Sequence, residues 1–587
     1  MSTMRINSLK TCAARLAAAV ALCLCVASTV SAKVVTVGSG SGYLNYPTAQ
    51  TTLGLQPGDT VYIAAGTYSG LSISNIAGTA DAPITIKCDP NAVFSTATAV
   101  GNSMANLTFV RFEDFRYESY AARCMNISGR CHDLLFKNFH ITNIGDWVFR
   151  IYDSTLVFDG TKDSTYHNFK FENVVVDGGI GGVIINSDWA SVANLKSMAL
   201  DFEIVHCSFS NLGGTVIGLS KAFNLKVHDC LFSNMGGPGG STGHNSMIDL
   251  TGYATIYNNR FTQGWGDDVR AFPIKLNALG YGGSDAVIRF YNNISWEKKK
   301  YPMYEHNGVA QADLDASAGL LSRTASEICF NTLYRSRKVD YIATLVDILY
   351  ANVTIKHNLV IEPECDAAFN PTRNYVYQVT GGSGNLVVSN NLVYSTFAAS
   401  GLTDAVSFVP SETSPARNSA TGTVPYIAQD HYGGIRYVGA GDVGAVERQL
   451  AGDFNGDGTV THGDYTAWAD NFGRSIATVR GEHAGWFPLG SYADGATSIT
   501  QGLYTTWADH FGDTAGSSMI VGLPNSPAVS EGFCAVETLA GASPNPGAAE
   551  RQSLAERRAQ RLAERRQARL DRAALRQQRR FERAAAR

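Results

Sequence analysis

One short pattern recurs along this chain and constrains its fold more than any other feature. It reads apolar, any residue, apolar, any two residues, an anchor, any residue and apolar, as in residues 225–232. The anchors are Phe115, Phe139, Val174, Cys207, Cys230, Asn259, Asn293, Asn331, Asn358 and Asn391. Alternating apolar residues indicate a strand with one buried face, and a recurring anchor indicates the same turn in every repeat.

The spacing of these anchors predicts an all-β chain, wound as a right-handed, single-stranded parallel β-helix over about residues 33–447. The shortest intervals fit one coil, and the longer ones fit a coil of similar size with a loop added. The amide of each anchoring Asn is expected to bond the same turn above and below it. A β-sandwich is the alternative, but sandwiches do not keep side-chain register over so many units. The residues expected to stack inside the core are Leu225, Val227 and Phe232 above Phe202, Ile204 and Phe209.

The charge of the chain is unevenly distributed. The formal net charge is −4, but both ends are basic, so the part between them is strongly acidic. The basic residues near the start, the apolar run 16–30 and the small residues at 31–32 are typical of a signal peptide. We therefore expect residues 1–32 to be removed and the mature chain to be secreted, without a transmembrane segment.

The cysteines of the mature chain are scattered, with no Cys-x-x-Cys pair and no Cys/His metal spacing. This arrangement disfavours a zinc site. Export permits disulfides. Cys207 and Cys230 anchor consecutive coils, so we expect them to stack either as thiols or as a disulfide.

Residues 57–68 and 78–86 are similar to the first coils of secreted bacterial β-helix proteins, and residues 414–416 and 442–447 to their closing segment. These segments identify a resemblance to the pectate-lyase-like fold with PbH1 repeats, a group that includes alginate lyases and chondroitinase B. The resemblance implies a β-helix and a carbohydrate ligand. It does not fix the activity, because one fold serves many functions.

A second module is expected at residues 451–513. Oxygen-bearing side chains occupy positions 1, 3, 5 and 12 of a loop of EF-hand type, with Gly458 at the sharp turn. Calcium is a hard cation that takes six to eight oxygen ligands, and this spacing wraps them around one point. The expected ligands are Asp453, Asn455, Asp457, the carbonyl of Thr459, and Asp464.

The helix expected at residues 465–473 recurs at 504–512, but the loop before the second copy lacks most of the ligands. The module therefore resembles a type I dockerin with one calcium loop, and the second repeat is expected to bind little or no calcium. The resemblance implies a cohesin-like protein as partner.

Residues 514–550 are rich in Ala, Gly, Ser and Pro and are expected to be a linker. Residues 551–587 are expected to form a helix with a stripe of arginines that binds an anionic surface or polymer; a solvated tail is the alternative. Nucleic acid is not expected as a partner. The stripe consists of Arg557, Arg561, Arg565, Arg569, Arg572, Arg576, Arg580, Arg583 and Arg587.

Acids, cations and aromatic residues gather in the two long coils between Asn259 and Asn331. A uronate lyase needs a neutralised sugar carboxylate, a base for the C5 proton and an acid for the leaving oxygen. Calcium in this groove would be one way to neutralise the carboxylate. The candidate catalytic residues are Asp249, Asp267, Asp268, Arg270, Lys275, Lys298, Glu305 and His306.

Together these features predict a secreted carbohydrate-active protein, either a polysaccharide lyase or a glycoside hydrolase, acting on an extracellular polysaccharide that is either acidic, such as a uronate polymer, or neutral. The alternative is a non-catalytic surface protein that binds glycans. The dockerin-like module favours an enzyme, whereas the absence of known lyase signatures favours the alternative. The sugar, the linkage and the partner stay open at this stage.

Overall fold

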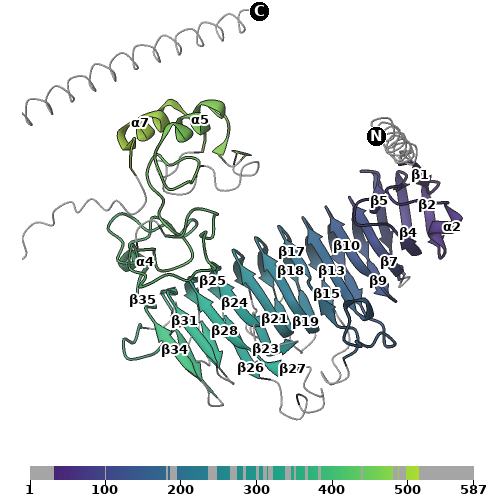
Figure 1. The fold of residues 1–587 in the computed structure, drawn as a ribbon, viewed down its shortest axis with the longest axis horizontal. Helices are drawn as coiled ribbons and strands as arrows, with labels where there is room; N and C mark the ends of the chain where they lie inside the picture. The colour runs from purple at the N-terminus through teal and green to yellow at the C-terminus, as the bar shows by residue number, and fades with distance from the viewer. Residues whose placement is uncertain are drawn as a thin grey trace, which may run out of the picture. The chain divides into compact units, whose positions relative to one another are not determined.

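The computed structural model describes residues 32–98, 101–179, 183–185, 195–235, 247–264, 274–281, 286–298, 303–308, 314, 321–336, 345–348, 352–363, 368–380, 385–437, 440–476, 478–479, 487 and 497–513. The expected signal peptide, except for Ala32, and the expected linker and Arg-rich helix thus lie outside the described residues. The strands from β1 (Val34–Val37) to β35 (Leu392–Tyr394) are linked in one series of 35. Figure 1 shows them stacked in chain order.

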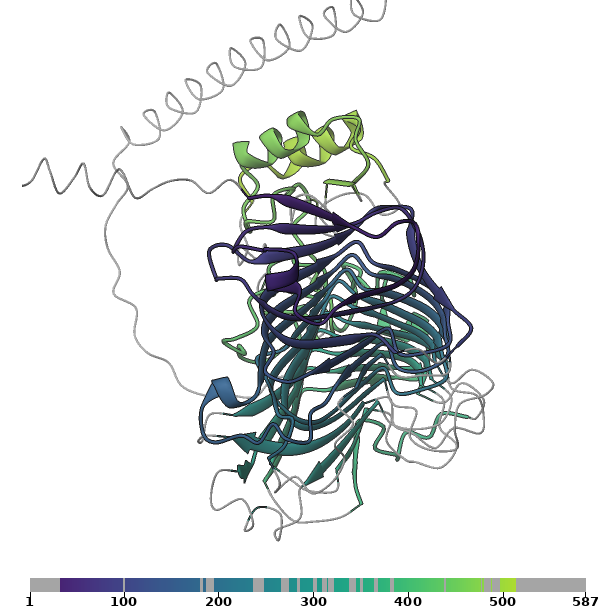
Figure 2. The same cartoon turned by 90° about the vertical axis from the view of Figure 1, so that its right-hand side faces the viewer.

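Almost all strand pairs are parallel, and each strand pairs with the equivalent strands of the coils before and after it. The chain thereby returns to the same three sheets once per coil, as Figure 2 shows nearly along the stack. The first sheet contains β1, β3 (Thr60–Ile63), β5 (Ile84–Cys88), β7 (Ser103–Glu113), β10 (His132–Lys137), β13 (Tyr166–Glu172), β16 (Ala199–Leu200), β17 (Glu203–Val205), β19 (Ile217–His228), β21 (Ile248–Tyr257), β24 (Val287–Tyr291), β28 (Ala325–Cys329), β31 (Val353–Lys356) and β34 (Leu386–Ser389).

The second sheet lies after the anchor of each coil. It contains β2 (Ser41–Tyr46), β4 (Gly66–Ala77), β6 (Ala92–Thr96), β8 (Arg116–Tyr120), β11 (His140–Ile144), β14 (Val175–Gly179), β18 (Ser208–Leu212), β20 (Leu231–Met235), β22 (Arg260–Gly264), β25 (Ile294–Lys298), β29 (Thr332–Ser336), β32 (Leu359–Ile361) and β35.

The third sheet is formed by β9 (Met125–Ser128), β12 (Phe149–Ile151), β15 (Ile184–Ile185), the first residues of β19 and β21, β23 (Ile274–Tyr281), β26 (Tyr304–Gly308), β30 (Val346–Ile348) and β33 (Tyr377–Val379). Strand β27 (Leu321–Arg323) pairs antiparallel with the end of β23. The short helices α2 (Ala49–Thr52), η1 (Lys162–Ser164) and α4 (Phe397–Ser400) add to the stack.

The core stacks as the repeat predicts. Ile204 pairs with Val227, and Phe209 pairs with Phe232 with ring centroids 5.2 Å apart. Towards the N-terminus the stack is aromatic, and the rings of Phe115 and Phe139 lie 5.0 Å apart and nearly parallel. Burying apolar area is worth about 25 cal/mol per Å², so a continuous apolar interior is the main source of stability in such a stack.

The anchoring asparagines form the predicted ladder. The backbone N–H of Asn293 donates to Oδ1 of Asn331 at 3.0 Å, and the N–H of Asn331 donates to Oδ1 of Asn358 at 3.0 Å. The side-chain amide of Asn331 also donates to the side chain of Asn358 at 2.9 Å. The same bonds extend to Asn259 and Asn391 at the two ends. Each turn is thus fixed by the turn of the next coil.

Cys207 and Cys230 continue this ladder as free thiols. The backbone N–H of Cys207 donates to Sγ of Cys230 at 3.4 Å, and both side chains are buried. Of the two alternatives in the sequence, the structure has the thiol pair. Every cysteine among the described residues is a free and buried thiol.

The last strand ends at Tyr394, and residues 402–449 then form a covering segment that packs on the outside of the second sheet. The N–H of Ala445 donates to Oγ1 of Thr332 at 2.8 Å, and the N–H of Gly444 donates to the carbonyl of His357 at 2.9 Å. A side chain at Gly444 would meet Thr332 Oγ1 at 2.8 Å, and its φ of +112° also favours glycine. The segment that resembles a closing motif therefore covers the side of the last coils.

Residues 453–513 contain the two expected helices, α5 (His462–Asp470) and α7 (Gln501–His510), related by an internal repeat. The indole N–H of Trp468 donates to the carbonyl of Thr500 at 2.8 Å, and the indole of Trp507 donates to the carbonyl of Thr461 at 2.6 Å. Each tryptophan thus holds the N-cap residue of the other helix. Among the described residues, no helix is long and apolar enough to cross a membrane.

Candidate functional site

Three of the candidate residues lie in one row across the third sheet. Asp249 of β21 pairs with Lys275 of β23, which pairs with Glu305 of β26. The row continues to Asp347 of β30 and Gln378 of β33. Because successive residues of a strand point to opposite faces, the residues of one row share a face of the sheet. The topology therefore brings together acidic and basic residues that are distant in the sequence.

The flanking residues show which face this is. Ile248 and Leu250 are fully buried in the core, so Asp249 between them points outward. Asp249 is nevertheless only 8% exposed. Neighbouring groups therefore cover most of this outward-pointing side chain.

Asp347, which the sequence did not indicate as a candidate, is a second buried carboxylate between two apolar residues of the core. It lies between the buried residues Val346 and Ile348 and is 2% exposed. Its carboxylate accepts a hydrogen bond from Oγ1 of Thr380 at 2.8 Å. Burial raises the pKa of Asp347 above its usual value, although the hydrogen bonds from Thr380 and Gln378 oppose the shift. This carboxyl is protonated more readily than an exposed one. Asp347 joins the row through the pairing of β26 with β30, and no sequence motif indicates that pairing.

Lys221 is a second residue that the sequence did not indicate. It lies in β19, in an irregular stretch next to the strand that carries Asp249, and it is 1% exposed. A lysine buried to this extent is rare outside functional sites and paired clusters. It follows three residues after Gly218, the residue of β19 that pairs with Asp249.

His306 lies on the other face from Glu305. It is 2% exposed, and its Nδ1 lies 2.9 Å from Oγ of Ser326 and 3.3 Å from the hydroxyl of Tyr304. Burial lowers the pKa of His306 to about 4, so the ring is neutral at physiological pH. His306 is a hydrogen-bonded residue of the interior, and the outward row does not include it.

The other candidates do not join the row. Lys298 belongs to β25 in the second sheet, where it pairs with Gly264 and Ser336. The candidates in the long loop, Asp267, Asp268 and Arg270, lie outside the described residues.

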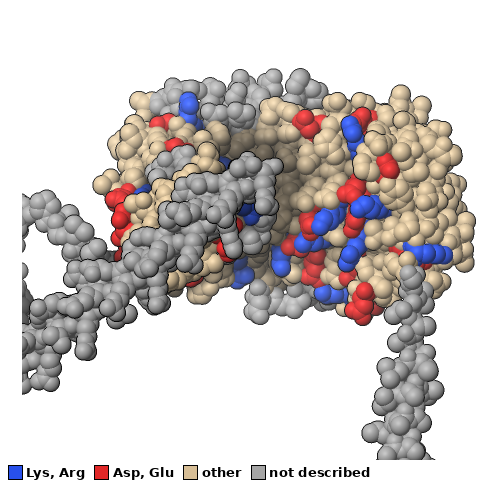
Figure 3. All heavy atoms as spheres, turned by 90° about the horizontal axis from the view of Figure 1, so that it is seen from above, with Lys and Arg blue, Asp and Glu red and all other residues tan. Residues whose placement is uncertain are grey.

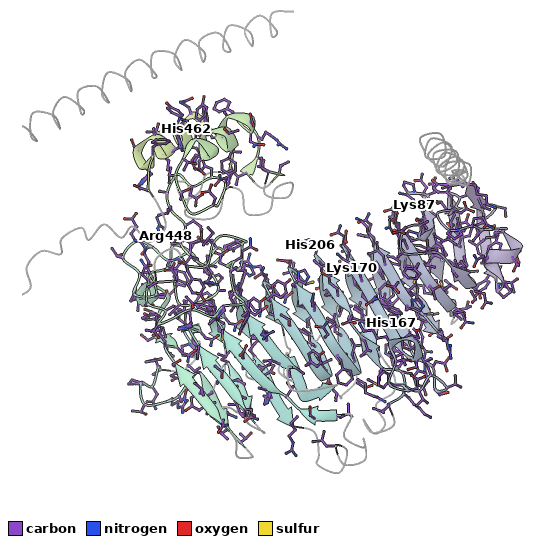
Figure 4. All side chains as sticks on the ribbon, viewed as in Figure 1. Lys87, His167, Lys170, His206, Arg448 and His462 are labelled. Atoms are coloured by element: carbon purple, nitrogen blue, oxygen red, sulfur yellow. The ribbon has the colours of Figure 1, made fainter. Side chains whose placement is uncertain are left out.

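His132, Asp133 and His167 form the one group of three His, Cys, Asp or Glu side chains, among the described residues, whose ligand atoms all lie within 4.8 Å of one another. The two rings stack at 4.6 Å, and Asp133 bonds to Nδ1 of His132 at 2.6 Å and to the amide of Asn168 at 2.9 Å. The three side chains therefore lie together because they stack and form hydrogen bonds between successive coils. His167 is labelled in Figure 4.

The expected calcium loop has oxygen ligands directed to its own backbone. The carboxylate of Asp453 accepts from the N–H of Gly458 at 2.8 Å, and that of Asp464 accepts from the N–H of Asn455 at 3.0 Å. Burial, together with the charges of Asp464 and Asp457, raises the pKa of Asp453 to about 7. The three carboxylates are not among the groups that meet the 4.8 Å spacing.

The chemistry of this set nevertheless fits calcium. Three carboxylates, the Asn455 amide and a backbone carbonyl are the hard oxygen donors that the ion takes. Two of the carboxylates, those of Asp453 and Asp464, are completely buried. Buried acids in mutual repulsion are stabilised by a cation.

No known family profile and no curated protein matches this chain. Several solved structures resemble it at low similarity. The pectate lyase Pel9A is 14% identical over 70% of this chain and 98% of its own, with a TM-score of 0.37. The mannuronan C-5 epimerase AlgE6 A-module of Azotobacter vinelandii is 11% identical over 62% of this chain and 91% of its own, with a TM-score of 0.33. The PL6 family polysaccharide lyase Pedsa3628 of Pseudopedobacter saltans is 11% identical over 61% and 93%, with a TM-score of 0.34. Structural similarity at this level supports no conclusion about the activity of this chain.

Proposed function

We propose that this chain is a secreted carbohydrate-active enzyme with a right-handed β-helix, which cleaves a uronate-containing extracellular polysaccharide on the outer face of the third sheet. The observation that carries the proposal is the row of Asp249, Lys275, Glu305 and Asp347 on neighbouring strands. A row of acids with a central lysine offers both the charge to hold a uronate and the groups to move protons.

Elimination is the reaction that this set supports best. A base takes the C5 proton, the C4–O bond breaks as the C4–C5 double bond forms, and an acid protonates the leaving oxygen. In this proposal the charge of Lys275 neutralises the sugar carboxylate, and Asp249 or Glu305 takes the proton. Asp347 is suited to donate a proton because burial raises its pKa.

Hydrolysis is a second candidate, because Asp249 and Glu305 lie two strand steps apart. At about 4.8 Å per step this is roughly 9–10 Å along the sheet. Inverting hydrolases place their two carboxylates about 6.5–9.5 Å apart, which leaves room for a water.

Incubation of the full chain with polygalacturonate, alginate and a neutral glucan distinguishes these reactions. A lyase produces unsaturated ends that absorb in the ultraviolet, and a hydrolase produces reducing ends without that absorbance. Neither product on any polymer would overturn the proposal and favour the glycan-binding alternative. Asp249→Asn is expected to reduce the rate at least about tenfold by removing one proton-transfer group, which typically contributes 10²–10⁴-fold.

We also propose that residues 451–513 are a dockerin-like module that attaches the enzyme to a cohesin-like partner, and that the ligands from Asp453 to Asp464 bind one calcium ion. Titration calorimetry of the full chain is expected to show one site, lost in Asp453→Ala and kept in Asp494→Ala, where Asp494 is the residue of the second repeat equivalent to Asn455. Affinity is expected to fall below about pH 7, where Asp453 takes up a proton. Two equivalent sites, or unchanged binding in Asp453→Ala, would contradict the proposal.

A further inference from the structure

The row that carries the candidate acids continues towards the N-terminus to Arg150. Asp249 pairs with Gly218, which pairs with Ile185, and Ile185 pairs with Arg150 of β12. The next residue of the row is Asn126 of β9. Arg150 therefore lies on the same face as Asp249, three strand steps away, which is roughly 14 Å at about 4.8 Å per step.

Arg150 belongs to a cluster of two guanidinium groups and two aromatic rings. Its guanidinium lies 5.0 Å from the ring centre of Tyr152 and 5.7 Å from that of Trp147. The guanidinium of Arg123 lies over the same Trp147 ring at 4.9 Å. Phe149 and Ile151, on either side of Arg150, are buried in the core, so Arg150 points outward. The cluster thus brings two cations and two ring surfaces together around the outward-pointing Arg150.

One buried polar atom at this place, Oδ1 of Asn126, has no hydrogen-bond partner among the described residues. Nε of Arg123 lies 3.0 Å from Oδ2 of Asp146 in an ion pair, so this guanidinium already has one carboxylate partner. Buried polar groups in native proteins nearly always have a partner, so the unsatisfied acceptor of Asn126 indicates a missing polar ligand.

We propose that Arg123, Asn126, Trp147, Arg150 and Tyr152 form a remote subsite for an acidic sugar unit of the polymer that the row of acids cleaves. This inference rests on the proposed function. It adds the path of the polymer along the third sheet, from the row of acids to Arg150. A guanidinium binds a carboxylate through two parallel hydrogen bonds, and aromatic rings offer flat surfaces for the sugar ring.

The electrostatics of the cluster agree with this ligand. Burial and the neighbouring charge of Arg123 lower the pKa of Arg150. A sugar carboxylate beside Arg150 would offset this repulsion. The amide oxygen of Asn126 can accept from a sugar hydroxyl, a bond that a free inorganic anion does not offer.

The subsite predicts a dependence on oligomer length. A hexose unit in an extended chain advances by about one strand spacing, so an oligomer of about four or five units is needed to reach from the row to Arg150. In the full-length protein, Arg150→Gln is expected to weaken the binding of an octamer of galacturonate or mannuronate about tenfold, which is about 1.4 kcal/mol. Binding of a trimer at the row is expected to stay unchanged.

Arg116→Gln is the matched control, because Arg116 is an exposed arginine of β8 in the second sheet. Binding is measured by calorimetry, and KM and kcat by the product assay. A raised KM for the octamer with unchanged kcat supports the subsite. Octamer binding equal to that of the unaltered protein, or equal losses for trimer and octamer, would overturn it. Should the protein cleave no polymer, octamer binding that still depends on Arg150 would leave the subsite standing while the proposed catalysis fails.

Discussion

Leu231 and Leu359 occupy the same row on the outer face of the second sheet, but their surroundings differ. Leu231, in the part of the stack nearer the N-terminus (the open half), is 38% exposed, whereas Leu359, nearer the C-terminus (the covered half), is 1% exposed. The row connects them through the pairings of β20, β22, β25, β29 and β32. The difference is the covering segment, which packs against Leu359 and its neighbours.

The open half of the stack carries charges on its outer surface. On the first sheet, Lys87 pairs with Asp114 at 2.9 Å, Lys137 with Glu172 at 2.8 Å, and Lys170 with Glu203 at 3.5 Å. Figure 3 shows such opposite charges side by side over the coils, and Lys87 and Lys170 are labelled along that edge in Figure 4. Exposed pairs of this kind contribute about 0–1 kcal/mol each, so the aromatic interior dominates the stability of this half.

The covered half depends on buried polar contacts instead. Its turns are held by the asparagine ladder, and the covering segment carries the fully buried Arg436 beside Glu447 at 3.8 Å. The two halves share one winding of the chain, but they depend on different interactions. We expect the covered half to be the more sensitive to single substitutions.

The largest difference is expected for the anchors themselves. Asn331→Ala removes the acceptor of the buried N–H of Asn293 and the donor to the carbonyl of Phe290. Each buried group left without a partner costs about 1–3 kcal/mol, so we expect a loss of about 4 kcal/mol. Cys230→Ala, at the same position of the open half, is expected to cost about 1 kcal/mol. Equal losses in denaturant unfolding would refute this contrast.

A smaller difference is expected for the two leucines that define the comparison. Leu359→Ala creates a cavity between the sheet and the covering segment and is expected to cost about 3 kcal/mol. Leu231→Ala, in the same row, is expected to change stability by less than about 0.5 kcal/mol. The two variants are compared by hydrogen exchange of their own coils. A costly Leu231→Ala would mean that the open half is also covered.

A third difference is expected from pH. Burial lowers the pKa of His357, beneath the covering segment, and of His431, within it, to about 4. A detached segment would titrate these rings near pH 6.5. Their contribution to stability is therefore complete above pH 6.5 and is lost as the pH falls towards 4.

Asp430 and Asp442, with raised pKa values, act in the opposite direction. We expect the protection of the amide of Gly444 from hydrogen exchange to decrease between pH 6.5 and 4, and the amides of β11 to change less. Protection of Gly444 that increases on acidification would contradict this.

The repeat predicted the winding, the stacked core and the asparagine ladder, because each depends on residues a fixed distance apart in the chain. The covering segment was not predicted, since it has no period. A signal for it does exist in Leu359-Val360-Ile361, an unbroken apolar strand, because a strand buried on both faces loses the alternation of an exposed one.

The candidate site was predicted in part for the same reason. Asp249, Lys275 and Glu305 were identified from composition, but their alignment in one row is set by the lengths of the loops between them. Asp347 and Lys221 were missed, because a single acid or lysine in an apolar strand has no motif. His306 was included because it follows Glu305, although the alternation of the strand directs it inward.

The most direct test of the central claim is the rate at which Asp347→Asn cleaves a polyuronate, compared with the unaltered protein. The substitution keeps the size of the side chain and an acceptor for Thr380, but it removes the carboxyl that we assign as proton donor. We expect a rate at least about 100-fold lower, the usual contribution of a positioned acid, with an unchanged melting temperature. A variant that folds equally well and cleaves at the original rate would show that the row on the third sheet is not the catalytic site.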